Sequence, residues 1–227
     1  KGSSLVSQQE YVQAIRRGLD CGMFVLRRTA AVVNGLVAVE KTDGSQRLVI
    51  NAKPANALFE QPDKVTFPTP DILARIRVPP GHRLFVAKSD AADFFYQFAL
   101  PDWLIPVFGL PAVRVGDLGH DLGFDPDLLV YPCMRVLPMG WSHSPLLAQE
   151  AHRHIIYSRT SLRPEDEITD SFDGDVSRVR HAICQDDVSF FHITAEGCNW
   201  GLDDYAGAMA VERLPLKWKK VRRAALE

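Results

Sequence analysis

The segment Cys184-Gln185-Asp186-Asp187 places two adjacent carboxylates between two apolar runs. The runs, Ala182–Cys184 and Val188–Ile193, predict a β-hairpin with both acids at its tip. A third acid, Asp90, follows the apolar run Arg83–Lys88, which is typical of a buried strand. The sequence therefore predicts three carboxylates at the ends of apolar strands, where charged groups are costly.

A charged carboxylate held beside apolar strands destabilises the folded state unless a partner compensates for its lost hydration. A divalent cation is one such partner, because hard ions such as Mg²⁺ prefer carboxylate oxygens and often keep substrate phosphates as further ligands. Two ions roughly 3.5–4 Å apart can assist an in-line displacement at phosphorus. The three acids therefore indicate phosphoryl transfer with two Mg²⁺ ions, or with Mn²⁺ in their place.

Adjacent acids also have ordinary structural uses. Asp203-Asp204 is a second pair, and it is more simply explained as acids that favour a helix start. Asp93 alone has the same simple explanation. The prediction of phosphoryl transfer therefore depends on the ordered set of acids together with a glycine-containing turn, Leu137–Pro145, which lies between them in the sequence.

The overall composition is that of an ordinary globular protein. The chain has 227 residues, of which 46% are hydrophobic and 24% charged, and this suits one large domain or two small lobes. Its net charge of −2 argues mildly against a nucleic-acid binder, which is usually basic. Basic residues nevertheless crowd the segments 16–28 and 217–223, so the sequence still permits a local basic groove.

No apolar run is long enough to span a bilayer, and no signal-peptide pattern follows Lys1. The first residue is not Met, which indicates a fragment or a processed chain. The four cysteines have no C-x-x-C spacing, which argues against a zinc site and favours a reducing compartment. We therefore expect no membrane partner and an intracellular protein, cytoplasmic or nuclear. The four are Cys21, Cys133, Cys184 and Cys198.

Helix signals occur at several points. Ser7 and Glu10 form a capping-box pair, which predicts a helix beginning after Ser7. Thr69 followed by Pro70 is typical of an N-cap and first helical position. Apolar spacing predicts two further helices, over 144–157 and 203–214.

Strand signals alternate irregularly with these helices. The segments 36–41 and 47–51 predict a β-hairpin with a turn at Asp43-Gly44. A final strand is expected over 215–220. The irregular alternation favours an α+β fold over a regular α/β one.

The segment Asp90-x-x-Asp93-x-Phe95-x-x-Phe98-x-Leu100 resembles the first catalytic motif of the reverse transcriptases of retroviruses and LTR retrotransposons. The resemblance implies that Asp90 is a metal ligand and that the backbone at Asp93 and Phe94 meets the nucleotide triphosphate. It further implies that Phe95 blocks a ribose 2′-hydroxyl and so favours deoxynucleotides. Core packing is the structural alternative for this phenylalanine.

The segment Leu137-Pro138-Met139-Gly140-Trp141, followed by Ser144-Pro145, is similar to the second motif of that family. There, the glycine turn and the helix after it support the template and the incoming base. The resemblance implies nucleotide contacts at Met139 and Gly140. It implies template or primer positioning by four neighbours, Pro138, Trp141, Ser144 and Pro145. A generic turn before a Ser-capped helix is the alternative.

Cys184-x-Asp186-Asp187 occupies the place of the family's Tyr-x-Asp-Asp. The resemblance implies that Asp186 is the second main metal ligand, with Asp187 adjacent and less direct. Cys184 and Gln185 are then expected beside the template and primer.

Two flanking segments extend the resemblance to roughly 39–222. Arg47-Leu-Val-Ile-Asn-Ala-Lys-x-x-Asn56 looks like the hairpin of the fingers, where Arg47 would contact the triphosphate and Lys41 would assist. In Leu214-Pro-Leu-x-x-x-Lys219-Lys220, either lysine could be the general acid that protonates the leaving pyrophosphate. Solvated surface charge is the alternative explanation for both segments.

The sequence departs from the family pattern at several positions. Cys184 replaces the usual Tyr, Met139 a common Gln, and Asn51 and Lys53 the usual Asp and Arg. The loops 116–127 and 163–175 look like insertions. The sequence stops where the thumb should begin, and it has no RNase H segment.

The resemblance implies an α+β right-hand polymerase fold with an antiparallel palm sheet backed by helices and without the thumb. We expect fingers in 1–82, palm with the first catalytic motif in 83–100, a return with an inserted loop in 101–143, and palm with the Asp-Asp hairpin in 144–227.

The implied activity is an RNA-directed DNA polymerase core of a retroelement, with an RNA or DNA template, a primer and deoxynucleoside triphosphates as partners. An RNA-dependent RNA polymerase is one alternative, which Phe95 disfavours. A catalytically inactive or domesticated scaffold module is another, favoured by the net charge and the altered motif positions. The sequence leaves the oligomeric state open.

Overall fold

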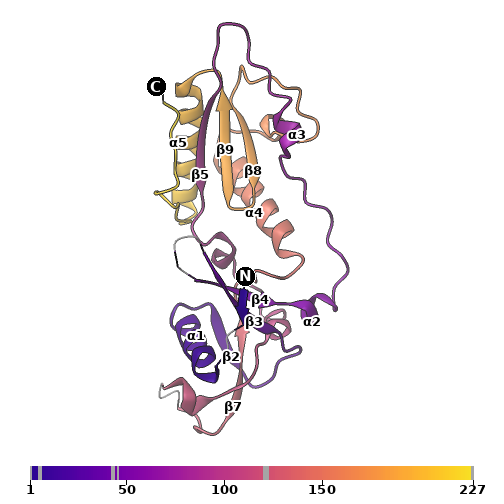
Figure 1. Cartoon of the computed structure of the whole chain (residues 1–227), viewed down its shortest axis with the longest axis vertical. Helices are drawn as coiled ribbons and strands as arrows, with labels where there is room; N and C mark the ends of the chain where they lie inside the picture. The colour runs from indigo at the N-terminus through magenta and orange to yellow at the C-terminus, as the bar shows by residue number, and fades with distance from the viewer. Residues whose placement is uncertain (1, 5–6, 42–43, 45, 120–122, 226–227) are drawn as a thin grey trace. The chain divides into compact units, whose positions relative to one another are not determined.

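A computed structural model describes residues 2–4, 7–41, 44, 46–119 and 123–225 (Figure 1). The chain forms two compact units, each built from two stretches of sequence. The first unit combines Lys1–Pro62 with Phe95–Ser144, and the second combines Asp63–Phe94 with Pro145–Glu227. Each unit is described by itself below.

The first unit contains two three-stranded antiparallel sheets. One has the order β1-β3-β4, with β1 at Gly2–Ser4, β3 at Gly35–Glu40 and β4 at Gln46–Asn51. The other has the order β2-β7-β6, with β2 at Phe24–Arg27, β7 at Leu129–Met134 and β6 at Val113–Arg114. The predicted hairpin is thus confirmed, as β3 and β4. Asp43, expected in its turn, lies outside the described residues.

Short helices complete the first unit. In α1 (Gln8–Asp20), the predicted capping box is confirmed: Ser7 Oγ accepts from the Glu10 N–H, and the Glu10 carboxylate accepts from the Ser7 N–H. The same helix buries Ile15 in the core. The others are α2 (Lys53–Asn56) and the 3₁₀ helices η2 (Ile105–Phe108) and η3 (Val115–Leu118).

The second unit is built around one antiparallel sheet of order β5-β9-β8. Its strands are β5 (Phe85–Asp90), β8 (Arg180–Cys184) and β9 (Asp187–His192). The predicted strand ending at Asp90 and the hairpin bearing the Asp-Asp pair are both confirmed. The arms of this hairpin are apolar, and their side chains Ile183, Val188 and Phe190 are buried in the core.

Two long helices pack on this sheet. The helix α5 (Ala195–Val211) contacts β5 and β9 (Figure 1), and α4 (Ser144–Arg159) hydrogen-bonds to the end of β8. The Thr69 N-cap of the short helix α3 (Pro70–Leu73) is confirmed, because its side chain accepts from the Ile72 N–H. The remaining elements are η1 (Phe94–Gln97), where the chain passes between the units, and η4 (Pro164–Asp166).

At the end of the chain, one predicted helix has different bounds and one predicted strand was wrong. The helix expected over 203–214 begins eight residues earlier, at Ala195, with Thr194 as its N-cap. Glycines at 197 and 201 weaken the helix signal, yet Gly201 is needed, because a Cβ there would lie 2.9 Å from the Phe190 ring. Close packing against the sheet therefore outweighs low helix propensity.

The strand expected over 215–220 does not form. Leu216 and Arg222 make only isolated bridges, to Ala91 and Lys88, and residues 218–220 form a turn. This part of the chain follows the edge strand β5 irregularly, which brings its lysines to the end of that strand. Among the described residues, no helix combines the length and the apolar character that crossing a membrane requires.

Candidate active site

The three predicted carboxylates gather at one end of the β5-β9-β8 sheet. Asp90 is the last residue of β5, and its Cα pairs with that of Asp187, the first residue of β9. Asp186 precedes it in the two-residue turn from β8, and its carbonyl accepts from the Ala91 N–H at 2.8 Å. Antiparallel pairing therefore brings together acids nearly one hundred positions apart in the sequence.

The turn that carries Asp186 is conformationally strained. Its first residue, Gln185, has φ +55°, in the left-handed region that costs a non-glycine residue roughly 1–2 kcal/mol. Such a conformation persists only where neighbouring groups hold it in place. This turn therefore needs hydrogen bonds from outside the hairpin to hold it.

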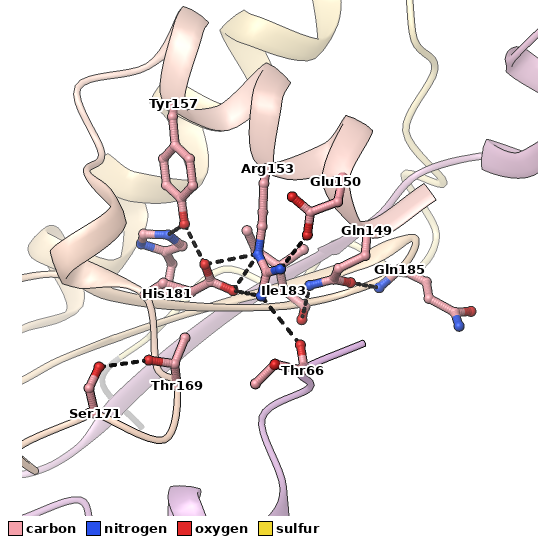
Figure 2. Close-up of polar contacts among 11 residues, drawn as sticks. Thr66, Gln149, Glu150, Arg153, Tyr157, Thr169, Ser171, His181, Ile183 and Gln185 are labelled. Atoms are coloured by element: carbon pink, nitrogen blue, oxygen red, sulfur yellow. Dashed lines mark hydrogen bonds and ion pairs between the residues drawn. The ribbon is translucent and has the colours of Figure 1, made fainter. Parts of the chain in front are cut away.

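Side chains of α4 supply these bonds, and Figure 2 shows those of Gln149. Gln149 bridges the hairpin: its Nε2 donates to the Ile183 carbonyl at 3.0 Å, and its Oε1 accepts from the Gln185 N–H at 2.8 Å. His152 Nδ1 lies 2.5 Å from the Gln185 carbonyl oxygen. Both side chains are fully buried, so these hydrogen bonds form away from water.

Further along the same helix, a partly buried polar cluster anchors the loop before β8. Arg153 forms a bidentate contact with Glu167, with Nη2 and Oε1 2.8 Å apart, and the Tyr157 hydroxyl donates to Glu167 Oε2 at 2.6 Å. The Tyr157 hydroxyl also lies 3.2 Å from His181 Nε2 (Figure 2). With residues 149, 153 and 157 on one face, α4 contacts both ends of β8.

Two lysines from the irregular C-terminal segment neutralise Asp90. Lys220 Nζ donates to Asp90 Oδ2 at 2.5 Å, and Lys217 Nζ forms an ion pair with Oδ1 at the same distance. Lys217 Nζ also lies 3.6 Å from Asp186 Oδ2. Because Asp90 is only 3% exposed, this pairing compensates for the burial of its charge.

The environment shifts the pKa values of these groups in different directions. Burial acts to raise the pKa of Asp90, but the two lysines outweigh it and hold that pKa below its usual value. Burial and the charges of Asp186 and Asp90 raise the pKa of Asp187. The hydrogen bond to Asp90 raises the pKa of Lys220. The pKa shifts therefore favour the charged forms of Asp90 and Lys220, and they oppose ionisation of Asp187.

These residues are of the type that holds Mg²⁺. Proteins bind Mg²⁺ through one or two carboxylates plus substrate phosphates, and the Lys217 ammonium already lies as a cation between Asp90 and Asp186. That placement fits two carboxylates around a divalent ion. In the part of the chain that the structure describes, no three His, Cys, Asp or Glu side chains converge as a complete metal site.

A polar cavity of about 290 Å³ opens beside the acids. It brings the carboxylates of Asp90 and Asp187 together with three cationic side chains. Such a mixture suits a ligand that carries both phosphate groups and a bound cation. The lining residues are Lys88, Ser89, Asp90, Asp187, Lys220 and Arg222.

The first unit contains the predicted glycine turn. Gly140 has φ +118°, and a Cβ there would lie 2.1 Å from the Ile50 carbonyl oxygen, so only glycine fits. The Ile50 N–H donates to the Met139 carbonyl at 3.0 Å, which ties the turn to β4. Asn56 fixes the other side, because its Nδ2 donates to the Gly140 carbonyl and its Oδ1 accepts from the Ser142 N–H.

Other predicted residues of the first unit stabilise the same turn. Ser144 Oγ donates to the Pro138 carbonyl at 2.6 Å, and the buried Trp141 ring stacks on His143.

Two further predicted residues of the first unit lie elsewhere. Phe95 is buried at 7% exposure. Arg47 lies on β4 opposite Val39.

The structure thus distributes the predicted site residues over both units. The first contains the triphosphate, steric and glycine-turn candidates: Lys41, Arg47, Phe95, Pro138, Met139, Gly140, Trp141 and Ser144. The second contains the acids and their neighbours: Asp90, Asp93, Phe94, Pro145, Cys184, Gln185, Asp186, Asp187, Lys219 and Lys220.

Within the second unit, the structure gathers some of these residues and separates others. Asp93 is exposed with φ +47°, whereas Phe94 is buried and packs against the His152 ring. Lys220 reaches Asp90, but Lys219 forms no ion pair with the described acids. The predicted roles of these side chains toward a nucleotide stay predictions.

Sequence reasoning missed three residues that contact the acids or their turn. Lys217 lies in the basic run that the sequence shows, but its irregular backbone hid which lysine reaches Asp90. Gln149 and His152 lie four and seven positions after Pro145, on a helix predicted only from its apolar spacing. A polar residue at a core-facing helical position was the available signal.

Solved structures share this fold. The foamy viral protease–reverse transcriptase dRH in complex with double-stranded DNA matches with a TM-score of 0.68 and 14% identity, over 96% of this chain and 32% of that one. The foamy viral protease–reverse transcriptase in complex with double-stranded DNA matches at 0.65 and 15%, over 95% and 37%. The native prototype foamy virus protein gives 0.62 and 14%, over 91% and 22%.

The fold of this chain is therefore similar to that of one part of these reverse transcriptase structures. The chain spans between 22% and 37% of the length of these neighbours. At this identity the likeness concerns the mixture of helices and antiparallel sheets, not the activity. No protein-family model matches the sequence, and no curated protein matches it either.

Proposed function

We propose that the chain is the catalytic core of an RNA-directed DNA polymerase, which transfers a deoxynucleotide to a primer 3′-hydroxyl. One observation carries the proposal: Asp90 and Asp187 face each other across β5 and β9, Asp186 lies in the adjoining turn, and one ammonium group lies between Asp90 and Asp186. The fold neighbours that hold double-stranded DNA support nucleic acid as the partner.

In this proposal Asp90 and Asp186 hold two Mg²⁺ ions, or Mn²⁺, and Asp187 has a less direct role. When bound, the ions supply charge neutralisation at the reacting phosphate groups. The chain's own contribution is to keep Asp90 ionised and both carboxylates fixed. The lowered pKa of Asp90 and the hydrogen bonds that hold the turn of Asp186 support that contribution.

The lysines would bind the phosphates of the nucleotide and primer. Lys220 donates to Asp90 Oδ2 and lines the cavity beside the acids. It is therefore the better candidate than Lys219 to protonate the leaving pyrophosphate. Lys217 is an additional candidate, since it lies on the same carboxylate.

For residues of the first unit, we propose contacts with the nucleotide. Lys41 and Arg47 would contact the triphosphate, and Phe95 would exclude a ribose 2′-hydroxyl. The turn at Met139-Gly140 would support the incoming base, since its close approach to β4 fixes the backbone there. Template and primer, of RNA or DNA, would lie along these residues.

The decisive experiment is primer extension on poly(rA)·oligo(dT) with Mg²⁺ or Mn²⁺, with dTTP compared with UTP. We expect metal-dependent incorporation of dTTP in preference to UTP. Asp186→Asn should lower incorporation by roughly 10²–10³-fold or more, because it removes a carboxylate proposed to hold the metal ion that neutralises the reacting phosphates. Asp203→Asn is the matched control, since Asp203 belongs to the other Asp-Asp pair and is ion-paired with Arg223 on the surface.

Other outcomes point to other functions. Equal use of UTP and dTTP would favour an RNA polymerase and contradict the assigned role of Phe95. A protein that binds primer–template but incorporates nothing, with no effect of Mg²⁺ on its unfolding midpoint, would favour a scaffold module. The lysine pairing of Asp90 is the observation that favours this second candidate, because it neutralises the acid without a metal.

A further inference from the structure

We infer that His152 is a positioning residue that fixes the peptide group leading into Asp186. This inference rests on the proposed function, because the position of Asp186 matters to catalysis only if its carboxylate takes part. His152 lies in the middle of α4, and its Nδ1 is 2.5 Å from the carbonyl oxygen of Gln185. That carbonyl belongs to the peptide bond whose nitrogen is the backbone nitrogen of Asp186.

The position of Asp186 depends on the two peptide groups on either side of its Cα. His152 holds the first of them through the Gln185 carbonyl. The Ala91 N–H holds the second, donating to the Asp186 carbonyl at 2.8 Å. With both peptide planes fixed, the Cα–Cβ direction of Asp186 is fixed as well, because only φ and ψ could otherwise rotate it.

Gln149 alone cannot do this. It pairs with the Ile183 carbonyl and the Gln185 N–H, which lie before the peptide group in question. Without His152, the Gln185 carbonyl would lose its α4 partner, at a residue whose positive φ already favours rearrangement. His152 therefore contributes something that the other hydrogen-bonding side chain of α4 does not.

The surroundings of His152 determine which nitrogen carries its proton. A carbonyl oxygen can only accept, so Nδ1 must carry the hydrogen and donate to Gln185. In a neutral ring Nε2 is then an acceptor, and the Tyr205 hydroxyl, 3.0 Å away, donates to it. Both His152 and Tyr205 are completely buried, and each nitrogen of the ring has one partner.

The ring is also held rigidly and kept neutral. The ring centroid of Phe94 lies 4.9 Å from that of His152, and the centroid of Tyr205 lies 5.5 Å away. Burial lowers the pKa of His152 to about 4, against a smaller opposing effect of the Gln185 carbonyl. A neutral ring with a fixed tautomer is a directional donor, which is what alignment of one carbonyl requires.

Two substitutions separate this role from simple packing. His152→Asn places an amide N–H near the position of Nδ1, so it can still donate to Gln185 but loses Tyr205. His152→Gln places its amide nearer the position of Nε2, so it keeps Tyr205 but loses Gln185. Both remove the ring contacts with Phe94, which makes them a matched pair. His154→Gln, on the exposed side of α4, is the control.

The first measurements do not need activity. In the full chain, ¹⁵N NMR of the imidazole should report the Nδ1–H tautomer for His152 at neutral pH. Hydrogen exchange over residues 183–188 should be faster in His152→Gln than in His152→Asn, whereas His154→Gln should match the wild type. The Nε2–H tautomer, or equal exchange in the two His152 variants, would overturn the inference.

Kinetics then test the link to Asp186. His152→Gln should lower kcat for dTTP addition by about 10–100-fold, a loss typical of a misplaced catalytic group, with KM changed far less. His152→Asn should recover most of that loss. Equal kcat values in the two variants would contradict the positioning role. If the wild type incorporates no nucleotide, the proposed function fails, and the tautomer and exchange data alone decide whether His152 fixes the turn.

Discussion

The turns at Gly140 and Gln185 both contain a residue at positive φ, but they are stabilised in different ways. The φ values are +118° and +55°, and both turns are held by side chains from elsewhere in their unit. At Gly140 the residue itself permits the conformation, and Asn56 adds hydrogen bonds at its edge. At Gln185 the residue resists the conformation, and buried side chains of α4 impose it. The second turn therefore depends far more on its surroundings.

A fall in pH should produce the largest difference in stability between the two units. His152 and His181 lie in the second unit, and burial lowers their pKa values to about 4 and about 3. The unfolded chain binds these protons near pH 6.5 and the folded chain does not, so stability falls as pH falls from 6.5 toward 4. His152 alone should cost on the order of 3 kcal/mol by pH 4.

Denaturant midpoints at pH 7, 5 and 4 measure this loss, and hydrogen exchange locates it. We expect the Gln185 turn to loosen in acid before the Gly140 turn does. The His152→Asn variant should show a shallower dependence, because one titrating group is gone. Equal loosening of both turns would mean that the buried histidines do not control the second unit.

Gly140→Ala should have the next largest effect, on the first unit. The new Cβ would meet the Ile50 carbonyl and occupy a backbone region that only glycine adopts easily, so we expect a loss of about 3 kcal/mol or more. Gly22→Ala separates these causes, because Gly22 has φ +74° with no atom within 4 Å of a Cβ. It should lose only about 1 kcal/mol in urea unfolding. Equal losses would show that the close approach to Ile50 is unimportant.

Gln149→Leu should lower stability by about 2 kcal/mol, because it leaves the Ile183 carbonyl and the Gln185 N–H without their partner in a buried site. Exchange at the Gln185 amide should rise, with little change at Gly140. Gln13→Leu, on the exposed face of α1, is the control and should be nearly neutral. A neutral Gln149→Leu would show that the strained turn holds itself.

Asn56→Ala should have the smallest effect, about 1 kcal/mol, because its two hydrogen bonds are partly exposed to water. Asn56→Asp keeps the acceptor for the Ser142 N–H and should recover part of the loss. If Asn56→Ala costs as much as Gln149→Leu, the contrast between the two turns is wrong. Both values come from the same urea titrations.

Local patterns in the sequence predicted much of this protein. The Ser7 capping box, the Thr69 cap, the hairpin over 36–51 and the acids at the ends of β5 and β9 all depend on residues close together in the chain. The glycine at 140 could also be read directly, since a turn that needs positive φ selects that residue. The assignment of the acids to a polymerase came from a resemblance, and it stays a proposal.

What the sequence could not predict depends on contacts between distant residues. The first turns of α5 contain glycine and still form a helix, because Gly201 fits closely against Phe190 and this outweighs the low helix propensity of glycine. The pairing of Lys220 with Asp90 joins residues 130 positions apart, and no local pattern distinguishes it from its neighbour Lys219.

The Gln185 turn shows the same limit most clearly. The sequence by itself determined that two acids end a hairpin, because apolar runs flank them. Only the tertiary structure decided how Asp186 is held, because the hydrogen bonds to Gln149 and His152 exist only once α4 packs beside the hairpin. A strained non-glycine residue carries no signal of its own, since the groups that hold it in place lie elsewhere in the chain.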